Sequence, residues 1–210
     1  MLRRIGPWLP AGLVVLAAAT PSAAQQHASI GALGYFVEQG STSENASQSG
    51  TWAGGEARVP VKRFTFAVRY LAGSLGGNPA RMDREVRDTQ LSLAYRVRPW
   101  LALAAQAKAM VIESDLSNSV ARMYGAAAAV SSGLGIMGVG ARVELAVYPI
   151  SSVVGARSLS LPRQVEVGVT YRPARLPVEL SLSYLMQDID FKDAADLRLG
   201  GPLLSVRLGR

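Results

Sequence analysis

The chain has 210 residues, enough for one domain, and carries a formal net charge of +7 from 22 basic and 15 acidic side chains. It has no cysteine, which excludes disulfides, thiolate metal sites and a lipidated N-terminal cysteine. A positive charge also occurs in nucleic-acid-binding proteins, but here the charges are scattered and we expect the chain to be exported, so we expect no nucleic-acid partner.

Residues 1–24 have the features of a secretory signal peptide. A basic stretch at 1–4 is followed by an apolar run at 9–19 and then by small residues, so we expect cleavage after Ala24. A membrane-anchoring helix is the alternative, but the run is shorter than the roughly 18 residues that a span needs, and Pro10 interrupts it.

From residue 29 onward, apolar and polar residues alternate in runs of about ten, which is typical of β-strands with one apolar and one polar face. In FTFAVRYL, for example, Phe64, Phe66 and Val68 lie on one face, and Thr65 and Arg69 lie on the other. The alternation predicts ten strands, at 29–38, 51–59, 64–72, 86–97, 101–112, 122–132, 138–148, 163–172, 178–187 and 196–208. The second and sixth alternate least clearly, so eight strands is the alternative count.

The predicted connections alternate between short and long. The short ones are 59–63, 97–100, 132–137 and 172–177, and the long ones are 39–50, 73–85, 113–121, 149–162 and 188–195. This is typical of a meandering transmembrane β-barrel, in which short periplasmic turns are opposite longer extracellular loops. The predicted fold class is therefore all-β, an antiparallel up-and-down transmembrane β-barrel formed by residues 25–210.

One glycine-rich segment matches a cofactor motif. Gly133, Gly135 and Gly138 have the G-x-G-x-x-G spacing of dinucleotide-binding proteins. That motif needs a following helix and an acidic residue about 20 positions later, whereas here a strand pattern follows and residues 155–162 hold no carboxylate. We predict a hairpin turn in which glycine supplies positive φ, and no bound cofactor. A membrane-spanning helix at 124–141 is disfavoured by its five glycines.

Alternation alone does not decide which face points outward. A soluble lipocalin-like barrel buries its apolar face, whereas an outer-membrane barrel turns it toward lipid. The polar face favours the membrane, because it is rich in small residues and its charges are mostly arginines matched by carboxylates. These charges are Arg58, Arg69, Arg96, Arg142, Arg172, Arg198 and Arg207 with Glu56, Asp88, Glu144, Glu166 and Glu179. On the apolar face, Phe64, Tyr95 and Tyr171 lie by short turns, with Trp100 in a turn, as in an interfacial aromatic girdle.

The alternation and the C-terminal segment resemble the small outer-membrane β-barrel proteins of Gram-negative bacteria, of OmpA and OmpX type. Gly201-Pro202-Leu203-Leu204-Ser205-Val206-Arg207-Leu208 is similar to that family's closing strand, in which a Gly-Pro bulge leads into alternating residues and a terminal aromatic. Leu208 stands here in place of the aromatic. The resemblance implies a location in the outer membrane, contact with its lipid and lipopolysaccharide, and insertion by the barrel-assembly machinery.

Few residues could support catalysis or bind a metal. The only histidine, His27, precedes the first predicted strand, so a Ser-His-Asp site or a histidine-ligated metal has no supported residue. Asp188, Asp190, Asp193 and Asp196 cluster near the last long loop, which suits a weak calcium site or a solvated loop. Their spacing fits no calcium-binding motif, so we favour the solvated loop. We predict no enzymatic activity, no metal and no cofactor.

The charges expected inside the barrel should be paired, because isolated charges in a narrow interior are costly. We expect a lumen charge network of Arg58, Arg69, Asp88, Arg96, Arg142, Glu144, Glu166, Arg172, Glu179 and Arg207. Within it, Glu179 should contact Arg172 and Arg207. Arg69 should face Asp88 across neighbouring strands. Such a network favours a filled lumen over a pore.

These features predict a non-enzymatic outer-membrane protein with a structural or surface-interaction role carried by its long extracellular loops. The mixed charges of residues 81–88 suit lipopolysaccharide phosphates or an extracellular protein partner, although a solvated loop has the same composition. Two alternatives stay open: a narrow outer-membrane pore, and a soluble periplasmic lipocalin-like barrel that binds a small apolar ligand.

Overall fold

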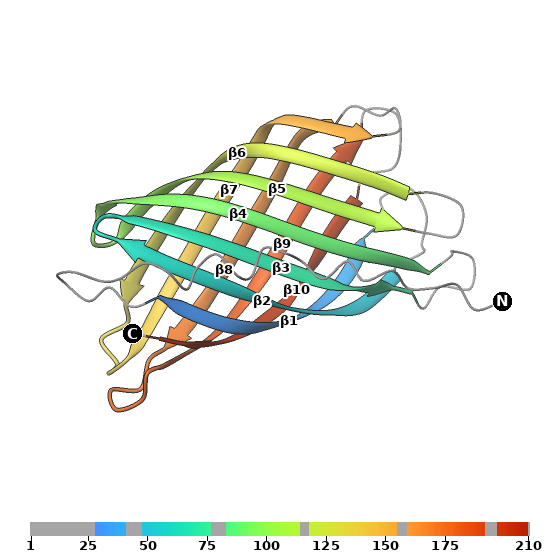
Figure 1. The fold of residues 1–210 in the computed structure, drawn as a ribbon. Helices are drawn as coiled ribbons and strands as arrows, with labels where there is room; N and C mark the ends of the chain where they lie inside the picture. Colours follow the sequence, from blue (N-terminus) through green and yellow to red (C-terminus); the bar gives the residue numbers. More distant parts are fainter. Residues whose placement is uncertain are drawn as a thin grey trace.

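The computed structural model describes residues 28–40, 48–76, 83–113, 118–154, 159–191 and 197–209. Ten β-strands account for nearly all of them (Figure 1). The strands are β1 Ser29–Gly40, β2 Gln48–Val61, β3 Phe64–Leu75, β4 Arg84–Arg98, β5 Leu101–Glu113, β6 Asn118–Gly133, β7 Val139–Val154, β8 Leu159–Tyr171, β9 Val178–Phe191 and β10 Leu197–Leu208. These ranges contain no helix with the length and apolar character needed to cross a membrane.

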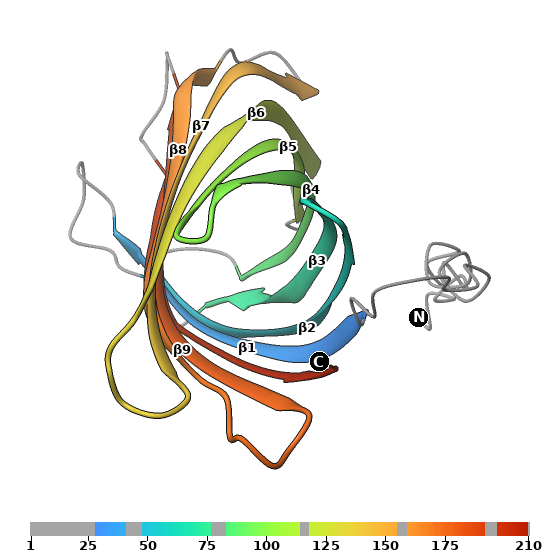
Figure 2. The same cartoon turned by 90° about the vertical axis from the view of Figure 1, so that its left-hand side faces the viewer.

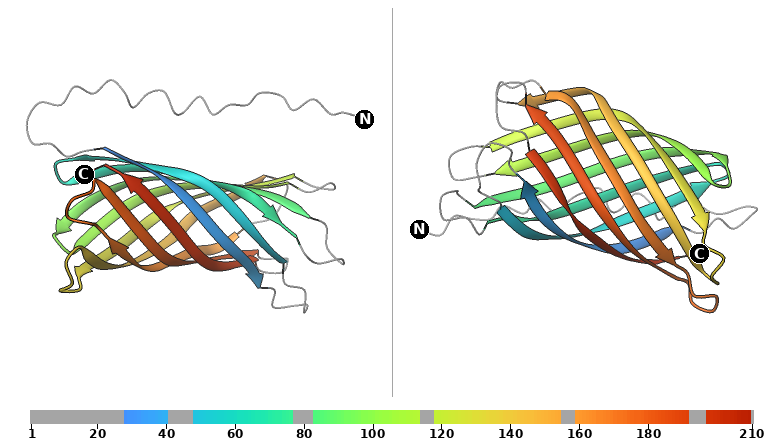
Figure 3. Two further views of the ribbon diagram at one scale, coloured as in Figure 1. Left: turned by 90° about the horizontal axis from the view of Figure 1, so that it is seen from below. Right: turned by 180° about the vertical axis from the view of Figure 1, so that it is seen from behind.

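Each strand pairs with its chain neighbours in antiparallel orientation, and β1 pairs with β10 to close the barrel (Figures 2 and 3). Ile30 lies opposite Leu208, so the start of β1 pairs with the end of β10. The prediction of an all-β, antiparallel up-and-down barrel is confirmed, with ten strands and not eight. The short connections and the end of β10 gather at one end, the short-turn end (Figure 1). We call the opposite end the long-loop end.

The closing strand β10 contains the Gly201-Pro202 pair, but this pair forms no bulge. The register of β10 with β9 runs unbroken from Leu197 to Leu208, and the β1 partners keep the same offset on both sides of the pair. A Cβ at position 201 would lie 1.8 Å from the carbonyl oxygen of Phe36. Glycine is therefore needed here because β1 and β10 approach closely.

The strands contain 12 to 16 residues, more than the roughly ten expected, and most of the extra length lies at the long-loop end. The expected loop at 149–162 is wrong, because β7 and β8 extend into it. Pro149 and Pro162, the bounds of the expected loop, both lie where the strand register shifts, and a bulge tolerates a residue that cannot donate a hydrogen bond. Most of segment 81–88 is also strand, since β4 begins at Arg84.

The four predicted short connections are confirmed. They join β2 to β3, β4 to β5, β6 to β7 and β8 to β9. In the β6–β7 turn, Gly135 has φ +73° and Gly138 has φ +77°. The apparent cofactor motif is thus part of a hairpin, and two of its three glycines, Gly135 and Gly138, occupy a backbone conformation that other residues rarely adopt.

The barrel wall separates apolar from charged side chains. On the outside, Phe66 is 52% exposed near the start of β3, and Leu91 is 51% exposed in the middle of β4. On the inside, Glu56 and Asp88 are each 5% exposed. The apolar face of the alternation therefore points outward, which is the reverse of a lipocalin-like barrel.

Candidate functional site

Side chains that point into the lumen change in character along the barrel axis. Toward the long-loop end lies an apolar plug: Tyr35, Val37, Trp52, Leu71, Leu75, Val86, Met110, Met123, Leu185, Ile189, Leu197 and Leu199. Below it is a polar bridge of Asp88, Lys108, Gln164 and Gln187. Next comes an arginine–glutamate cluster of Glu56, Arg58, Arg69, Arg142, Glu144, Glu166, Glu179 and Arg207. A cavity extends from this cluster to the short-turn end.

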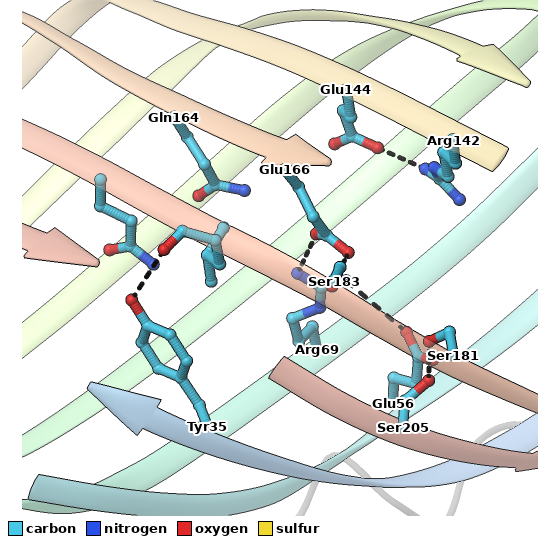
Figure 4. A network of polar contacts seen from close by, with 12 residues as sticks. Tyr35, Glu56, Arg69, Arg142, Glu144, Gln164, Glu166, Ser181, Ser183 and Ser205 are labelled. Atoms are coloured by element: carbon cyan, nitrogen blue, oxygen red, sulfur yellow. Dashed lines mark hydrogen bonds and ion pairs between the residues drawn. The ribbon is translucent and has the colours of Figure 1, made fainter. Parts of the chain in front are cut away.

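The apolar plug is built around an aromatic pair from β1 and β2. Trp52 is completely buried, and its indole meets the ring of Tyr35 edge-on at a centroid distance of 5.4 Å. The indole also lies against Gly73, where a Cβ would come within 2.5 Å of its Cδ1 atom. The Tyr35 hydroxyl donates a 3.1 Å hydrogen bond to the carbonyl oxygen of Leu185 (Figure 4). The two rings thus occupy part of the lumen, and the Tyr35 hydroxyl is hydrogen-bonded there.

The polar bridge connects opposite walls of the barrel. The Lys108 ammonium lies 2.9 Å from Asp88 Oδ2 and donates to Gln164 Oε1 at 2.8 Å. The amide of Gln187 donates to the same oxygen of Asp88 at 3.2 Å. Asp88 lies on β4 and Gln187 on β9, which are on opposite sides of the ring of strands, so this contact crosses the lumen. Only 2% of the Lys108 side chain is exposed, and a charge so buried requires its partner.

The arginine–glutamate cluster contains a second contact across the lumen. Arg69 Nη1 on β3 donates to Glu166 Oε2 on β8 at 2.9 Å, and the Ser183 hydroxyl donates to the other oxygen of Glu166 at 3.1 Å (Figure 4). Arg69 also lies 4.0 Å from Glu56. These strands are again on opposite sides of the ring, so the pair holds the two walls at a fixed separation.

Glu56 and Glu179 share Arg207. Arg207 Nε lies 2.7 Å from Glu56 Oε1, and its Nη2 lies 2.6 Å from Glu179 Oε1. Glu56 also accepts from Arg58 at 3.0 Å, and Glu179 pairs with Arg172 at the short-turn end. The contacts expected for Glu179 are therefore present. Arg207 is only 7% exposed, so both of its carboxylate partners help to hold it inside the barrel.

All ten residues expected in the lumen charge network line the lumen or its mouth. The expected contact of Arg69 with Asp88 is wrong, because Asp88 binds Lys108 while Arg69 binds Glu166. The placement of Arg198 on the inward-facing polar face is also wrong, because Arg198 lies on the outer surface, 3.4 Å from Asp188.

Two lumen cations were not expected from the sequence. Lys108 is in a segment dominated by alanine, where alternation is hard to see, although its even spacing from Gln106 was an available signal. Arg98 adjoins a turn and lines the mouth beside Arg96. Neither Arg96 nor Arg98 forms an ion pair with a carboxylate of the described ranges.

The cavity near the short-turn end has a volume of about 680 Å³. Its lining includes Arg58, Arg69, Arg96, Arg98, Arg142, Arg172 and Arg207, together with Glu56, Glu144 and Glu179. Hydroxyl groups of Thr65, Ser131, Ser132 and Thr170 line it as well. Neither the polar bridge nor the apolar plug lines this cavity, so both lie beyond its inner end.

The other candidate site residues do not form a site in the described part of the chain. His27, Asp193 and Asp196 lie outside the described residues, and Asp190 belongs to β9. Asp188 is engaged with Arg198. No group of three or more potential metal-ligating side chains occurs among the described residues.

Replacing Glu179 with Ala should lower the free energy of unfolding in detergent by about 1–3 kcal/mol, because it removes charge-assisted contacts to Arg172 and Arg207. The loss is limited because Arg207 keeps Glu56. Urea unfolding followed by intrinsic fluorescence measures it. Glu85→Ala is the matched control, since that carboxylate is exposed at the other end and should cost at most about 1 kcal/mol. Equal effects of both changes would contradict the role of Glu179.

Comparisons with known proteins concern the fold. No family model matches the chain, and no curated protein matches it in sequence. Among solved structures, Neisserial surface protein A is 17% identical over 89% of this chain and 100% of its own, with a TM-score of 0.47. Ail of Yersinia pestis is 9% identical over 87% of this chain and 98% of its own, with a TM-score of 0.39. LpxR from Salmonella typhimurium is 12% identical, covers 88% of this chain and 100% of its own, and has a TM-score of 0.38.

Proposed function

We propose that the chain is an integral β-barrel of the outer membrane of a Gram-negative bacterium, with a structural or surface-interaction role and no enzymatic activity. The observation that carries this proposal is the outer wall of the barrel. Large apolar side chains are exposed there on many strands, among them Phe66, Leu91, Leu145, Val167, Leu182 and Leu204. Soluble monomers rarely expose apolar patches beyond a few hundred Å². In an outer-membrane barrel, lipid covers such a wall and keeps its apolar side chains out of water.

Aromatic side chains support the same placement. Phe64, Tyr95, Trp100 and Tyr171 are all exposed and lie at or next to short turns. Phe64 and Tyr95 are opposite each other on β3 and β4, with ring centroids 5.1 Å apart. Amphipathic rings at this level suit the boundary between lipid tails and headgroups, so the short-turn end would lie at the periplasmic interface.

Outward-facing arginines lie at the long-loop end. Arg87 on β4, Arg122 on β6, Arg163 on β8 and Arg198 on β10 are each exposed and close to the start of their strands. The guanidinium group of arginine can bind a phosphate through two hydrogen bonds at once. We therefore propose lipopolysaccharide phosphates as partners of this ring, in addition to outer-membrane lipid. The closing strand β10 would present the C-terminus to the barrel-assembly machinery.

The lumen favours a structural or surface role over a conducting pore. The apolar plug and the polar bridge both cross it, and the polar bridge includes a contact between opposite walls. A barrel of about ten strands has little interior room once side chains fill it. Recordings of the inserted protein in planar bilayers should therefore show no conductance steps, and regular steps would contradict the closed lumen.

The membrane placement can be tested with single cysteines in this cysteine-free chain. Val169 points outward and is 46% exposed, whereas its neighbour Thr170 lines the cavity. A fluorophore on V169C should be quenched by brominated lipid in vesicles, and one on T170C should not. Because the two positions are adjacent on β8, they differ only in the face they occupy. Equal quenching, or recovery of the unmodified protein in a detergent-free soluble fraction, would contradict the proposal.

Replacing Leu91 with Arg should make folding into vesicles less favourable by about 2–4 kcal/mol, because a charge at mid-membrane depth must be removed from water. Leu91 is in the middle of β4 and points outward. Leu176→Arg is the control, since Leu176 is 56% exposed in the β8–β9 turn and should cost at most about 1 kcal/mol. Urea-dependent folding into vesicles measures both. If the barrel were soluble, neither substitution would matter much.

A further inference from the structure

The cavity at the short-turn end has the form of a ligand pocket. Its volume of about 680 Å³ is within the range of small-molecule sites. A second hollow of about 630 Å³ shares Arg58, Arg96, Arg172 and Arg207 with it and extends past the β8–β9 turn. The two form one recess that opens at the short-turn end and stops at the polar bridge.

The charge of this recess is unbalanced. Seven arginines line the cavity but only three glutamates do, and Glu166, which binds Arg69, adds a fourth carboxylate nearby. Every one of these carboxylates already contacts an arginine: Glu56 pairs with Arg58, Glu144 with Arg142 and Glu179 with Arg172. An excess of positive charge inside a low-dielectric wall strengthens the attraction for anions that enter.

Arg96 and Arg98 provide the guanidinium groups that are available to a ligand. Both are exposed, both line the cavity, and neither has a carboxylate partner in the segments described here. In contrast, the arginines deeper in the recess are committed to glutamates. Thr65, Ser131 and Thr170 add hydroxyl groups in the same wall. Two arginines together with nearby hydroxyl groups can donate hydrogen bonds to the oxygen atoms of a phosphate group.

We propose that this recess binds a soluble ligand that carries at least two phosphate charges and enters from the short-turn end. The phosphates would contact Arg96 and Arg98, and the rest of the ligand would occupy the cavity. A lipid headgroup is the other source of phosphate chemistry, but the wall is closed by hydrogen-bonded pairing of all ten strands. A lipid in the membrane therefore has no lateral route into the lumen.

Calorimetric titration of the full barrel in an uncharged detergent with inorganic diphosphate at low salt tests this proposal. We expect saturable binding to one site, weakened by added salt. The double variant R96Q/R98Q should lose about tenfold in affinity or more, because each charge-assisted hydrogen bond contributes roughly 1.5–3 kcal/mol and 1.4 kcal/mol is a factor of ten. The variant should fold, because neither arginine forms an ion pair within the described strands.

The control is R63Q/R175Q, which removes the same charge from exposed turn residues at the same end of the barrel that line neither hollow. Its affinity should match that of the unsubstituted chain. As a second measurement on a chain that keeps Arg96 and Arg98, bound diphosphate should slow labelling of T170C by an aqueous reagent. Absence of binding, or equal affinity in R96Q/R98Q, would overturn the proposal. Competition by micelles of phosphatidylglycerol would overturn the soluble source.

The recess belongs to the lumen, so this proposal does not depend on what surrounds the barrel. Quenching at V169C and the destabilisation caused by L91R test the membrane placement. The ligand proposal can therefore fail while the membrane placement holds, and the membrane placement can fail while the ligand proposal holds.

Discussion

Replacing Lys108 with Met should lower the free energy of unfolding by about 3–5 kcal/mol, because it leaves the Asp88 carboxylate buried without its cation. Asp88 would keep only the amide of Gln187, at 3.2 Å, and its side chain is 6% exposed. Met has a similar length to Lys, so the change removes charge with little change in packing. Urea unfolding in detergent, followed by fluorescence, measures the loss.

A variant that removes both charges separates two contributions to stability: the penalty for burying an unpaired carboxylate and the net contribution of the ion pair. The double variant D88N/K108M should recover most of the stability lost in K108M, since apolar or neutral replacement of a whole buried pair is often nearly neutral. Lys62→Met, in the exposed β2–β3 turn, is the matched lysine control and should change stability by about 0.5 kcal/mol or less. If K108M behaved like K62M, the polar bridge would not hold a buried charge.

Replacing Trp52 with Ala should cost about 3–5 kcal/mol, because it removes the largest side chain of the apolar plug and leaves a cavity. Its contacts with Tyr35 and Gly73 would be lost together. The surrounding strands are held by backbone hydrogen bonds around a closed ring, so they cannot move inward to fill the space. Thermal or urea unfolding in detergent measures the loss.

Trp100→Ala is the control for Trp52→Ala. Trp100 is 52% exposed in the β4–β5 turn, so its removal in detergent should cost far less than removal of a buried indole. The two variants delete the same side chain from opposite ends and opposite faces of the barrel. Equal losses would mean that the plug does not carry the packing assigned to it.

The two predictions concern the layers that separate the long-loop end from the recess. Because the plug and the polar bridge lie between them, a ligand held by Arg96 and Arg98 would have access from the short-turn end only. The lumen would then be a blind site and not a passage. This asymmetry arises because the inward side chains are apolar toward the long-loop end and charged toward the short-turn end.

The sequence predicted strands well where one face was continuously apolar. In β3, Phe64, Phe66 and Val68 alternate with polar or small residues, and the strand and its outward face were both predicted correctly. The long-loop ends were predicted poorly. There the inward residues, such as Leu71 and Leu75, are themselves apolar, so the contrast between the two faces is lost.

Some contacts within a hairpin were predictable, and the contacts across the lumen were not. Glu179 and Arg172 flank the same turn, so chain connectivity alone brings them together. Arg69 and Asp88 lie on adjacent strands, yet they belong to different layers, because Asp88 is in register with Leu71. Arg69 instead binds Glu166 across the lumen on β8, and Asp88 binds Lys108 on the neighbouring strand β5, where the run of alanines hides the alternation.

The sequence by itself determined the strands, their order in a meander and the two faces of the wall, because the period of two is a local property of an extended backbone. Only the tertiary structure decided which lumen residues share a layer. Closure with tilted strands sets the height at which side chains from opposite walls meet, and no local pattern encodes that height. For the same reason, the plug, the polar bridge and the basic recess became visible only once β1 was paired with β10.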